Sequence, residues 1–382
     1  MEQTFKFGIF YYFTMETHDV NSQTYSTNEL EKLKLLLWSS EIFKTNTPKV
    51  NIIIIIVESF LSFADELEFD DKEITPNLNQ LKKENTYYNS NVTPQVKLGE
   101  SSDGQFIYMT GLLPLNNTIT ATNYLNNTHI ALPSLLKQQK RISESRMIIP
   151  TGATFWRQDR VCQNYGVDSL FSQEDYPHQN RWLNDENIFK LAQNKDLTTN
   201  YPFLSIILTS SMHSPYNKVF EDNEFNFPPN YSTELKNYLK VLHYTDKQIG
   251  RYIHFLKESQ LYENSIIIIT GDHEAHAYNL NLSPDQEYIS QKIPLYIVNS
   301  PVAINKNSNY PISQMDIFPT LLDLTGIHSS WRGVGQSLLL PDSLANSPHE
   351  QLRREKAQEI SEIIIHSVYF RFHNYNSSHI PK

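Results

Sequence analysis

The stretch Ser265–His276, which reads SIIIITGDHEAH, constrains the fold of this chain more than any other. Four consecutive isoleucines are typical of a strand that is buried on both faces, as in a parallel sheet covered by helices. Ligands of open α/β sheets bind beyond the carboxyl ends of the strands. Here the isoleucines are followed within a few residues by Asp272, His273 and His276. An aspartate next to a histidine offers an oxygen and a nitrogen to a divalent metal ion, whereas the alternative is a polar loop that only caps the strand.

Two further apolar strands end in polar residues in the same way. Val50–Val57 (VNIIIIIV) is followed by Glu58, and Pro202–Leu208 (PFLSIIL) opens into a polar segment that contains His213. The alternatives are a helix-capping role for Glu58 and a structural role for His213. A long amphipathic helix is predicted over Thr233–Glu258 and leads into the isoleucine strand, an order typical of parallel sheets. The chain is therefore predicted to have an α/β fold with a mostly parallel sheet.

Local periodicity and turn signals predict several further elements along the chain. The predicted helices are Thr27–Phe43, Asn77–Glu84, Leu132–Lys140 and Ser313–Leu324. The predicted strands are Arg146–Ile149, Ile293–Val298 and, near the C-terminus, Ile363–Phe372. The sequence contains no internal repeat and no low-complexity segment, which favours ordinary globular domains over a repeat array.

Composition limits the classes of partner and site. The net charge is −10 and there is no basic tract, which argues against nucleic acid as the main partner. The single cysteine, Cys162, excludes an internal disulfide framework and a cysteine-rich metal site. No stretch reaches the roughly 18 apolar residues that a membrane span requires, and the aromatic segment Phe5–Phe13 lacks the length and cleavage pattern of a signal peptide.

The polar segment Gly99–Gly104 (GESSDG) supplies hydroxyl groups between the first two apolar strands of the chain. Ser101 and Ser102, beside a glycine and an aspartate, suit the N-terminus of a helix, where backbone amides and the helix dipole favour an anion. Simple capping is the alternative and needs only one of the serines. With the carboxylates and imidazole at the strand ends, a hydroxyl completes a four-ligand set suited to Zn²⁺ or Mn²⁺. A hydroxyl bound to a metal becomes a nucleophile at neutral pH, which indicates phosphoryl or sulfuryl transfer.

The order of these motifs resembles the lipoteichoic acid synthase branch of the sulfatase-like, alkaline-phosphatase superfamily, which includes phosphoglycerol transferases and has phosphoethanolamine transferases as relatives. The resemblance extends from Asn51 to Leu339 and rests on the order of the motifs rather than on any one of them. The motifs are NIIIIIVESF, TPNLNQL, GESSDGQF with GLLPL, TFWRQD, MHSPY, YTDKQIG, TGDHEAH, IPLYIVNSP and MDIFPTLLDLTGI. The resemblance implies a three-layer sandwich with a mostly parallel central sheet flanked by helices, plus a smaller C-terminal region that contains a strand.

The resemblance also implies roles for individual residues. Glu58, Asp272 and His273 match the family's metal ligands. Ser101 falls where the synthases have a nucleophilic threonine, so it is expected to contact the metal and to attack the substrate. His213 matches a histidine that contacts the phosphate or the departing alcohol, which implies both a catalytic and a substrate-binding role.

Three further residues are expected in the substrate pocket. Trp156 matches an aromatic residue that frames the head-group pocket of the family. The family's basic residue, two places later, is Gln158 in this chain, and Arg157 is the candidate substitute. The resemblance therefore does not fix glycerol phosphate as the head group. His276 is an additional candidate for substrate binding near the metal.

The implied activity is metal-dependent transfer of a phosphoglycerol- or phosphoethanolamine-type head group from a phospholipid to a cell-envelope acceptor, through a covalent phosphoseryl intermediate. The implied cofactor is one divalent ion, with Mn²⁺ as first choice and Zn²⁺ or Mg²⁺ as alternatives. The competing functions are a phosphodiesterase or phosphatase, a sulfatase, and a non-catalytic domain that binds an anionic glycan or lipid. A sulfatase is disfavoured because the loop around Ser101 lacks the C/S-x-P-x-R pattern of those enzymes.

The expected partners are a phospholipid donor and a glycan or polymer acceptor at the extracytoplasmic face of a bacterial membrane. Members of the family carry transmembrane helices before this domain, so residues 1–47 are interpreted as a membrane-proximal linker whose anchor is missing. Residues 48–340 are predicted to form the catalytic domain, and residues 341–382 an extension that completes it.

Overall fold

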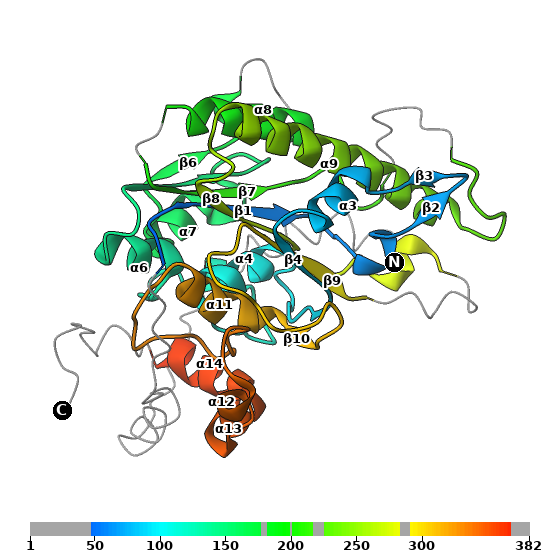
Figure 1. Ribbon diagram of the computed structural model, residues 1–382. Coiled ribbons are helices and arrows are strands. Elements are labelled where there is room, and N and C mark those ends of the chain that lie inside the picture. Colours follow the sequence, from blue (N-terminus) through cyan, green and yellow to red (C-terminus); the bar gives the residue numbers. More distant parts are fainter. Residues whose placement is uncertain (1–46, 177–181, 199–200, 217–224, 283–290, 368–382) are drawn as a thin grey trace.

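A single large sheet forms the centre of the computed structural model, which describes residues 47–176, 182–198, 201–216, 225–282 and 291–367. Its strands are β1 Asn51–Val57, β4 Thr86–Thr93, β5 Glu144–Ile148, β6 Ser169–Phe171, β7 Phe203–Leu208, β8 Ser265–Gly271, β9 Ile293–Val298 and β10 Ile312–Ser313. They lie in the order β10-β4-β9-β8-β1-β7-β5-β6 (Figure 1). Strand β9 runs antiparallel to both neighbours, and the other adjacent strands are parallel. The prediction of a mostly parallel sheet is confirmed.

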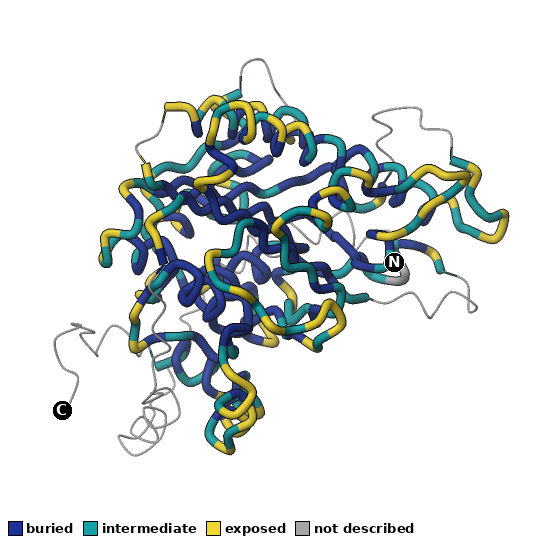
Figure 2. The backbone as a smooth tube through the Cα atoms, in the orientation of Figure 1, coloured by how far each residue is buried: buried dark blue, intermediate teal, exposed yellow. Residues whose placement is uncertain are grey.

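The isoleucine run of β1 explains why both faces of the sheet are covered. Ile52, Ile54 and Ile56 pack into one hydrophobic cluster, whereas Ile53 and Ile55 pack into a second. Successive side chains of a strand point to opposite faces, so a strand that is apolar at every position needs a layer on each side. Figure 2 shows the resulting arrangement, with buried backbone through the centre and exposed backbone outside it.

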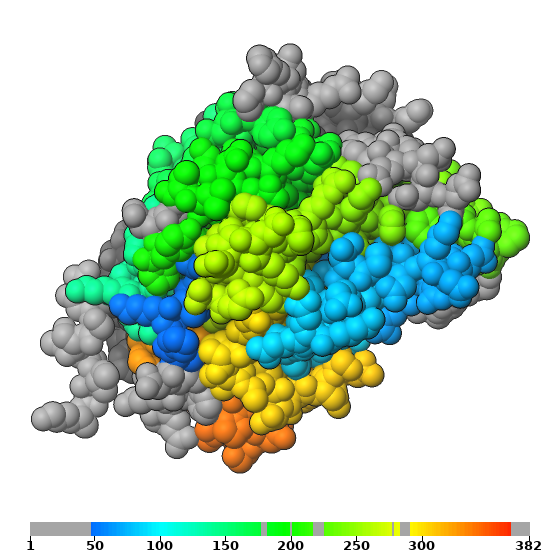
Figure 3. Space-filling model, turned by 45° about the horizontal axis from the view of Figure 1, so that its top comes forward, coloured from blue at the N-terminus to red at the C-terminus, as the bar shows by residue number. Residues whose placement is uncertain are grey.

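Two layers of helices supply the rest of these clusters. On one side lie α4 Ser101–Thr110, α6 Leu132–Gln138, α7 Gln158–Tyr165, α11 Ile317–Leu324 and α14 Ala357–His366. On the other lie α3 Pro76–Lys82, α8 Asp185–Asp196 and α9 Thr233–Glu258. Figure 1 shows the two groups on opposite sides of the sheet, and Figure 3 looks onto the face where α8 and α9 lie beside the blue segment that contains α3. The three-layer sandwich is confirmed.

The remaining elements are short. They are the strand pair β2 Glu68–Phe69 and β3 Lys72–Glu73, the helices α5 Thr120–Asn123, α10 Ala277–Leu280, α12 Asp342–Ala345 and α13 Pro348–Glu355, and the 3-10 turns η1 Ser62–Ala64, η2 Phe155–Arg157, η3 Gln173–Asp175 and η5 Gln314–Asp316. Among the described helices, none combines the length and the apolar character that crossing a membrane demands.

Most of the predicted elements are confirmed with small shifts at their ends. Helix α9 has the predicted bounds, and the helix predicted over Ser313–Leu324 begins as the 3-10 turn η5 before it continues as α11. Strand β4 was not predicted, because its sequence TYYNSNVT is polar and only partly buried. Helices α7 and α8 were missed as well, and the helix predicted over Thr27–Phe43 lies outside the described residues.

The predicted C-terminal strand at Ile363–Phe372 is wrong where the structure describes it. Residues 357–366 form helix α14, while 368–372 lie outside the described residues. Ile360 and Ile364 are buried against the first hydrophobic cluster, and this i, i+4 spacing identifies a helical face rather than a strand. The hydroxyl oxygen of Ser361 accepts a hydrogen bond from the backbone of Leu113 at 2.9 Å, which fixes α14 to the segment that follows α4. The proposed domain boundaries at 47/48 and 340/341 remain predictions.

One buried histidine is expected to make the fold sensitive to acid. The ring of His129 packs edge-on against Phe106 of α4 at 5.4 Å, and Nδ1 has no hydrogen-bond partner among the described residues. Burial lowers the pKa of His129 from 6.5 to about 4. The folded state thus binds fewer protons than the unfolded chain between these values, and stability is lost as pH falls through this window.

We expect His129→Leu to remove this acid sensitivity. A shift of this size corresponds to about 3 kcal/mol of unfolding free energy lost between pH 7 and pH 4. Denaturant unfolding of both proteins at the two pH values measures the difference, and equal losses in both proteins would contradict the prediction.

Candidate metal centre and active site

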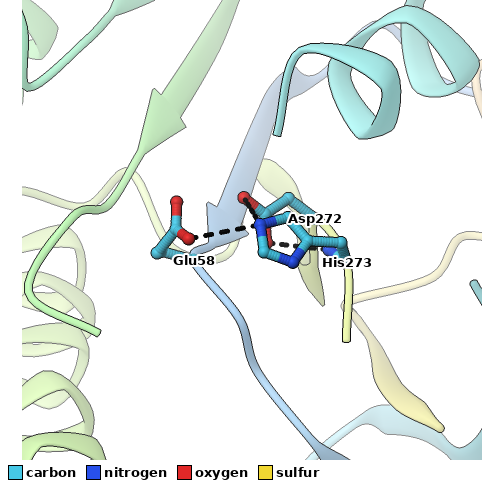
Figure 4. A group of neighbouring side chains, drawn as sticks. All are labelled: Glu58, Asp272 and His273. Carbon is cyan, nitrogen blue, oxygen red and sulfur yellow. Dashed lines mark hydrogen bonds and ion pairs between the residues drawn. The ribbon is translucent and has the colours of Figure 1, made fainter. Parts of the chain in front are cut away.

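The register of two central strands brings the predicted carboxylates together. Strands β1 and β8 are parallel, and Val57 lies opposite Gly271, so the next residues, Glu58 and Asp272, leave the sheet side by side. Figure 4 shows the side chains of Glu58, Asp272 and His273 converging at this edge. All three are buried, and one potential ligand atom of each lies within 4.8 Å of the others. The structure thus brings the three expected ligands into one cluster.

The orientation of His273 suits metal binding. Its Nε2 atom lies 3.2 Å from Glu58 Oε1 and 3.6 Å from Asp272 Oδ2. Its Nδ1 atom lies 2.8 Å from the carbonyl oxygen of Glu274, which we assign as the acceptor of the Nδ1 proton. A backbone acceptor on one ring nitrogen orients the lone pair of the other toward the ligand site. Two carboxylate oxygens and one imidazole nitrogen therefore fit a divalent ion such as Zn²⁺ or Mn²⁺.

The charges of the three side chains depend on one another. Burial opposes ionisation of Glu58, but the hydrogen bond and charge of His273 lower the pKa of Glu58 to about 2. Burial and the charge of Glu58 raise the pKa of Asp272 to about 7. Burial disfavours the charged form of His273, yet Asp272 and Glu58 raise the pKa of His273 well above its ordinary value. A divalent cation placed here would compensate the buried carboxylates and displace the proton of His273.

Backbone hydrogen bonds hold the loops that carry these ligands. The backbone N–H of Ser59 donates to Asp272 Oδ1 at 2.8 Å, and the N–H of Glu58 donates to the hydroxyl of Thr209, just after β7, at 3.0 Å. Ser59 and Glu100 have positive φ angles of 50° and 45°. Such conformations cost non-glycine residues about 1–3 kcal/mol each and cluster at functional sites. The backbone of these loops is therefore strained at Ser59 and Glu100, and the surrounding hydrogen bonds hold it in this conformation.

Helix α4 presents Ser101 to this cluster. The Ser101 hydroxyl donates to Glu58 Oε2 at 3.0 Å and lies 3.3 Å from His273 Nε2. The neighbouring Ser102 is 5% exposed, and its hydroxyl has no partner among the described residues. Because α4 begins at Ser101, the two serines point in different directions, and the geometry selects Ser101 as the candidate nucleophile.

Helix α4 packs closely against the loop that follows β8 and is hydrogen-bonded to it. A Cβ atom at Gly104 would lie 2.4 Å from the carbonyl oxygen of Asp272, so only glycine allows this approach. The hydroxyl of Tyr108 donates to the carbonyl of Gly271. The side-chain amide of Gln314 donates to the carbonyl of Asp272 at 2.7 Å and to the hydroxyl of Tyr108 at 3.0 Å. The nucleophile and two metal ligands are therefore held by the same contacts.

We expect Gln314→Leu to lower metal affinity by about 10- to 100-fold, the usual effect of losing an outer partner of a metal ligand. The substitution leaves the Asp272 carbonyl without its 2.7 Å partner and so loosens the loop that carries Asp272 and His273. Titration with Mn²⁺ or Zn²⁺ measures the affinity. Gln248→Leu, at a buried glutamine of α9 away from the ligand loops, is the matched control. Equal losses of affinity in both variants would show a general packing effect instead.

His213 lies in the polar segment that follows β7. It is exposed, its Nδ1 lies 2.7 Å from the carbonyl oxygen of Ser214, and its ring packs edge-on against Trp182 at 5.4 Å. The same segment begins at Thr209, whose hydroxyl accepts the hydrogen bond from the backbone N–H of Glu58. The exposed imidazole is therefore available to a ligand, but it is not part of the buried cluster of Glu58, Asp272 and His273.

The residues of the TFWRQD motif point in different directions. Trp156 and Arg157 both have φ of 53°, and Arg157 lines an open pocket together with Phe155. Gln158, in contrast, is buried and accepts a hydrogen bond from the side chain of Gln105 at 3.3 Å. The residue in the family's basic position therefore faces the interior, and Arg157 is the cationic residue at the surface of this turn.

His276 is linked to the ligand cluster by Glu100, which the sequence analysis did not identify as a site residue. His276 Nε2 lies 3.1 Å from Glu100 Oε1, and Glu100 Oε2 lies 3.6 Å from His273 Nδ1. The hydrogen bond to Glu100 raises the pKa of His276, although burial opposes this. The position of Glu100 directly before Ser101 is the only sequence signal for this link. Thr209 and Gln314 had no such signal, because their contacts are made between distant segments.

Comparisons with known proteins identify the family of this chain. The model of the sulfatase family matches residues 50–327. Lipoteichoic acid synthase 2 of Bacillus subtilis (strain 168) is 29% identical over 294 residues, which cover 72% of this chain and 45% of the relative. Lipoteichoic acid synthase of Staphylococcus aureus (strain USA300) is 29% identical over 296 residues, or 73% of this chain and 46% of the relative. The chain thus spans about half the length of these curated relatives.

Solved structures share the fold at lower identity. The lipoteichoic acid synthase LtaP from Listeria monocytogenes has a TM-score of 0.72 at 18% identity, covering 89% of this chain and 98% of that one. The phosphoglycerol transferase GacH of Streptococcus pyogenes, in complex with sn-glycerol-1-phosphate, has a TM-score of 0.60 at 16% identity, covering 91% and 94%. The periplasmic domain of EcEptC from Escherichia coli, in complex with Zn, has a TM-score of 0.57 at 16% identity, covering 80% and 90%. On the family match, this chain belongs to the sulfatase family.

Proposed function

We propose that this chain is a metal-dependent transferase that moves a phosphoglycerol- or phosphoethanolamine-type head group from a phospholipid to a cell-envelope acceptor. The observation that carries the proposal is the position of Ser101. Its hydroxyl lies 3.0 Å from Glu58 Oε2 and 3.3 Å from His273 Nε2, at the first residue of α4. A nucleophile placed there faces the ligand cluster and the positive end of a helix dipole, which favours an anionic phosphate.

The cofactor in this proposal is one divalent ion held by Glu58, Asp272 and His273, with the Ser101 hydroxyl as a further ligand. When bound, the ion would lower the pKa of the hydroxyl and neutralise charge on the phosphate oxygens. Mn²⁺ is our first choice because of the resemblance to the synthases. Zn²⁺, which one of the solved relatives contains, and Mg²⁺ are the alternatives.

In the first step, Ser101 Oγ attacks the phosphorus of the phospholipid diester. An Oγ–P bond forms, the P–O bond to diacylglycerol breaks, and the hydroxyl proton leaves to solvent. The departing oxygen needs a proton, and we assign His213 as its donor, because this exposed imidazole belongs to the segment after β7 that contacts Glu58 through Thr209. Trp156 from the neighbouring turn and His276 behind Glu100 are assigned to the head-group pocket, and Arg157 is assigned to substrate binding beside it.

In the second step, the acceptor hydroxyl attacks the phosphoseryl group. A new P–O bond forms, the Oγ–P bond breaks, and Ser101 regains a proton. His213, neutral after the first step, takes the proton of the acceptor hydroxyl and returns to its starting state. Water as the acceptor would make the same site a phosphodiesterase, which the position of Ser101 supports equally.

Intact mass after incubation with Mn²⁺ and phosphatidylglycerol or phosphatidylethanolamine tests the proposal. We expect an adduct on the chain equal to one phospho-head-group, with release of diacylglycerol, and no adduct on Ser101→Ala. The lipid that forms the adduct identifies the head group. Turnover without an added acceptor would favour the hydrolase. If no lipid and no metal gives an adduct or diacylglycerol, the phospholipid-transferase proposal is wrong.

The proposed location follows from the proposed donor. A phospholipid head group is reached at a membrane surface, and the solved relatives include a periplasmic domain. We therefore propose that the chain works at the extracytoplasmic face of a bacterial membrane, where a glycan or polymer would be the acceptor.

A further inference from the structure

An open pocket of about 650 Å³ lies near His213, the proposed proton donor. Its connection to the active site is Trp182, which lines the pocket and packs edge-on against His213 at 5.4 Å. The other residues that line it come from the turn after β5 and from η3, and are Gly152, Thr154, Phe155, Arg157, Gln173 and Glu174. A ligand in this pocket would therefore lie one side chain away from the proposed proton donor.

The aromatic residues give the pocket an apolar surface. Trp182 is 36% exposed and is one of the exposed large apolar residues of the described chain. It is held in place by Phe155, whose ring meets it edge-on at 5.2 Å. A rigid, exposed indole offers apolar contact area at a low entropic cost, as is common in binding sites.

The carboxylate of Glu174 is built into the pocket. Its Oε2 atom accepts hydrogen bonds from the hydroxyl of Ser172 and from the backbone of Ala153 at 3.2 Å. Its Oε1 atom lies where a Cβ at Gly152 would approach to 2.7 Å, so the absence of a side chain at Gly152 makes room for it. The hydrogen bond from Ser172 lowers the pKa of Glu174, which keeps the group ionised at neutral pH.

The charges in the pocket select among classes of ligand. Arg157 and Glu174 both line the pocket, so it contains one positively charged and one negatively charged side chain. A phosphate would meet the carboxylate, and an alkyl chain would have to desolvate two charges. A neutral ring with many hydroxyls can donate to the carboxylate, accept from the guanidinium and lay its apolar C–H face on the indole.

We propose that this pocket is a sugar-binding subsite, with Glu174 and Trp182 as the residues that determine specificity for the acceptor. The proposal rests on the transferase function proposed above, because it gives the glycan acceptor a place beside His213. It also extends that function, since it names a neutral sugar ring as the chemical group that the acceptor must present.

Saturation-transfer NMR with methyl β-D-glucopyranoside, methyl α-D-mannopyranoside and methyl α-D-galactopyranoside as probes tests the proposal without any lipid. We expect at least one glycoside to bind to the unmodified chain. Trp182→Ala and Glu174→Gln should each weaken binding by about 10-fold or more, the usual effect of losing a hydrogen bond to a charged group or an aromatic contact. Gly152→Ala, which displaces the Glu174 carboxylate without removing it, should weaken binding as well. Glu258→Gln, at an exposed carboxylate of α9, is the matched control and should not change binding.

The same variants separate the two proposals. With phospholipid and metal present, Trp182→Ala and Glu174→Gln should still form the Ser101 adduct, but transfer to the bound glycoside should require a higher glycoside concentration. Absence of glycoside binding while the adduct forms would overturn the sugar subsite alone. Tighter binding of ethanolamine or of glycerol phosphate than of any glycoside, abolished by Glu174→Gln, would also overturn it and assign the pocket to the head group. Glycoside binding without any adduct would instead contradict the transferase and leave the sugar site standing.

Discussion

Ser101→Ala is expected to abolish adduct formation and to lower turnover by at least about 10³-fold, while metal binding is weakened but not lost. The size follows from the role of the residue, since removing the nucleophile of an enzyme with a covalent intermediate costs several orders of magnitude in rate. Metal affinity should survive because Glu58, Asp272 and His273 still provide three ligand atoms within 4.8 Å of one another. Diacylglycerol release and metal titration on the same preparation measure the two effects.

Two other variants make this result specific. Ser101→Thr keeps a hydroxyl and should retain measurable turnover, because the lipoteichoic acid synthases that the chain resembles have threonine at this position. Ser102→Ala alters the neighbouring serine, whose buried hydroxyl has no partner among the described residues, and should leave turnover within a few-fold of the original. An adduct on Ser101→Ala, or a loss as large in Ser102→Ala, would show that the nucleophile is another residue.

The second large effect is expected from removing a metal ligand. Asp272→Asn should reduce metal affinity by more than about 100-fold, because even the outer partners of metal ligands contribute about 10- to 100-fold. The fold should tolerate the amide, since burial and Glu58 raise the pKa of Asp272 to about 7 and the metal-free fold disfavours its charged form. The amide oxygen can also keep the hydrogen bond from Ser59, which is 2.8 Å in length here.

Thermal and denaturant unfolding with and without metal measure this prediction. A ligand present at 100 times its Kd stabilises the folded state by about 2.7 kcal/mol. The unmodified chain should gain about that amount on addition of Mn²⁺ or Zn²⁺ and lose it again with a chelator. Asp272→Asn should gain little at the same metal concentration, whereas Asp71→Asn, an exposed control, should behave like the unmodified chain. Equal metal stabilisation of all three proteins would place the ion elsewhere.

Much of the site could be predicted from the sequence because it is built at strand ends. Each of β1, β7 and β8 is a nearly continuous apolar run that must lie inside a sheet, and parallel strands bring their carboxyl ends to one edge. Glu58 and the Asp272–His273 pair follow β1 and β8 directly, so their convergence follows from topology, whereas His213 lies further along the segment after β7. The GESSDG motif and the family resemblance predict Ser101 as the nucleophile, and the structure adds its hydrogen bond of 3.0 Å to Glu58.

Some elements could not be predicted because their stability comes from partners far away in the chain. Strand β4 lacks an apolar pattern and is fixed by antiparallel pairing with β9 and by contacts of Asn89 with the loop that contains Tyr310. The isoleucines of α14 suggested a strand because β-branched residues favour strands, but their packing under α4 makes them one face of a helix.

The sequence by itself determined the class of fold, the apolar strands that end in polar residues and the candidate metal-binding side chains. Each buried strand and the polar residues at its end are adjacent in the sequence, so local sequence patterns are sufficient to identify them. Only the tertiary structure decided that Ser101 rather than Ser102 faces the cluster, that Gln314 and Gly104 hold the Asp272 loop, and that Gln158 turns inward. Those outcomes depend on the direction of side chains and on contacts between segments up to two hundred residues apart, which no local pattern encodes.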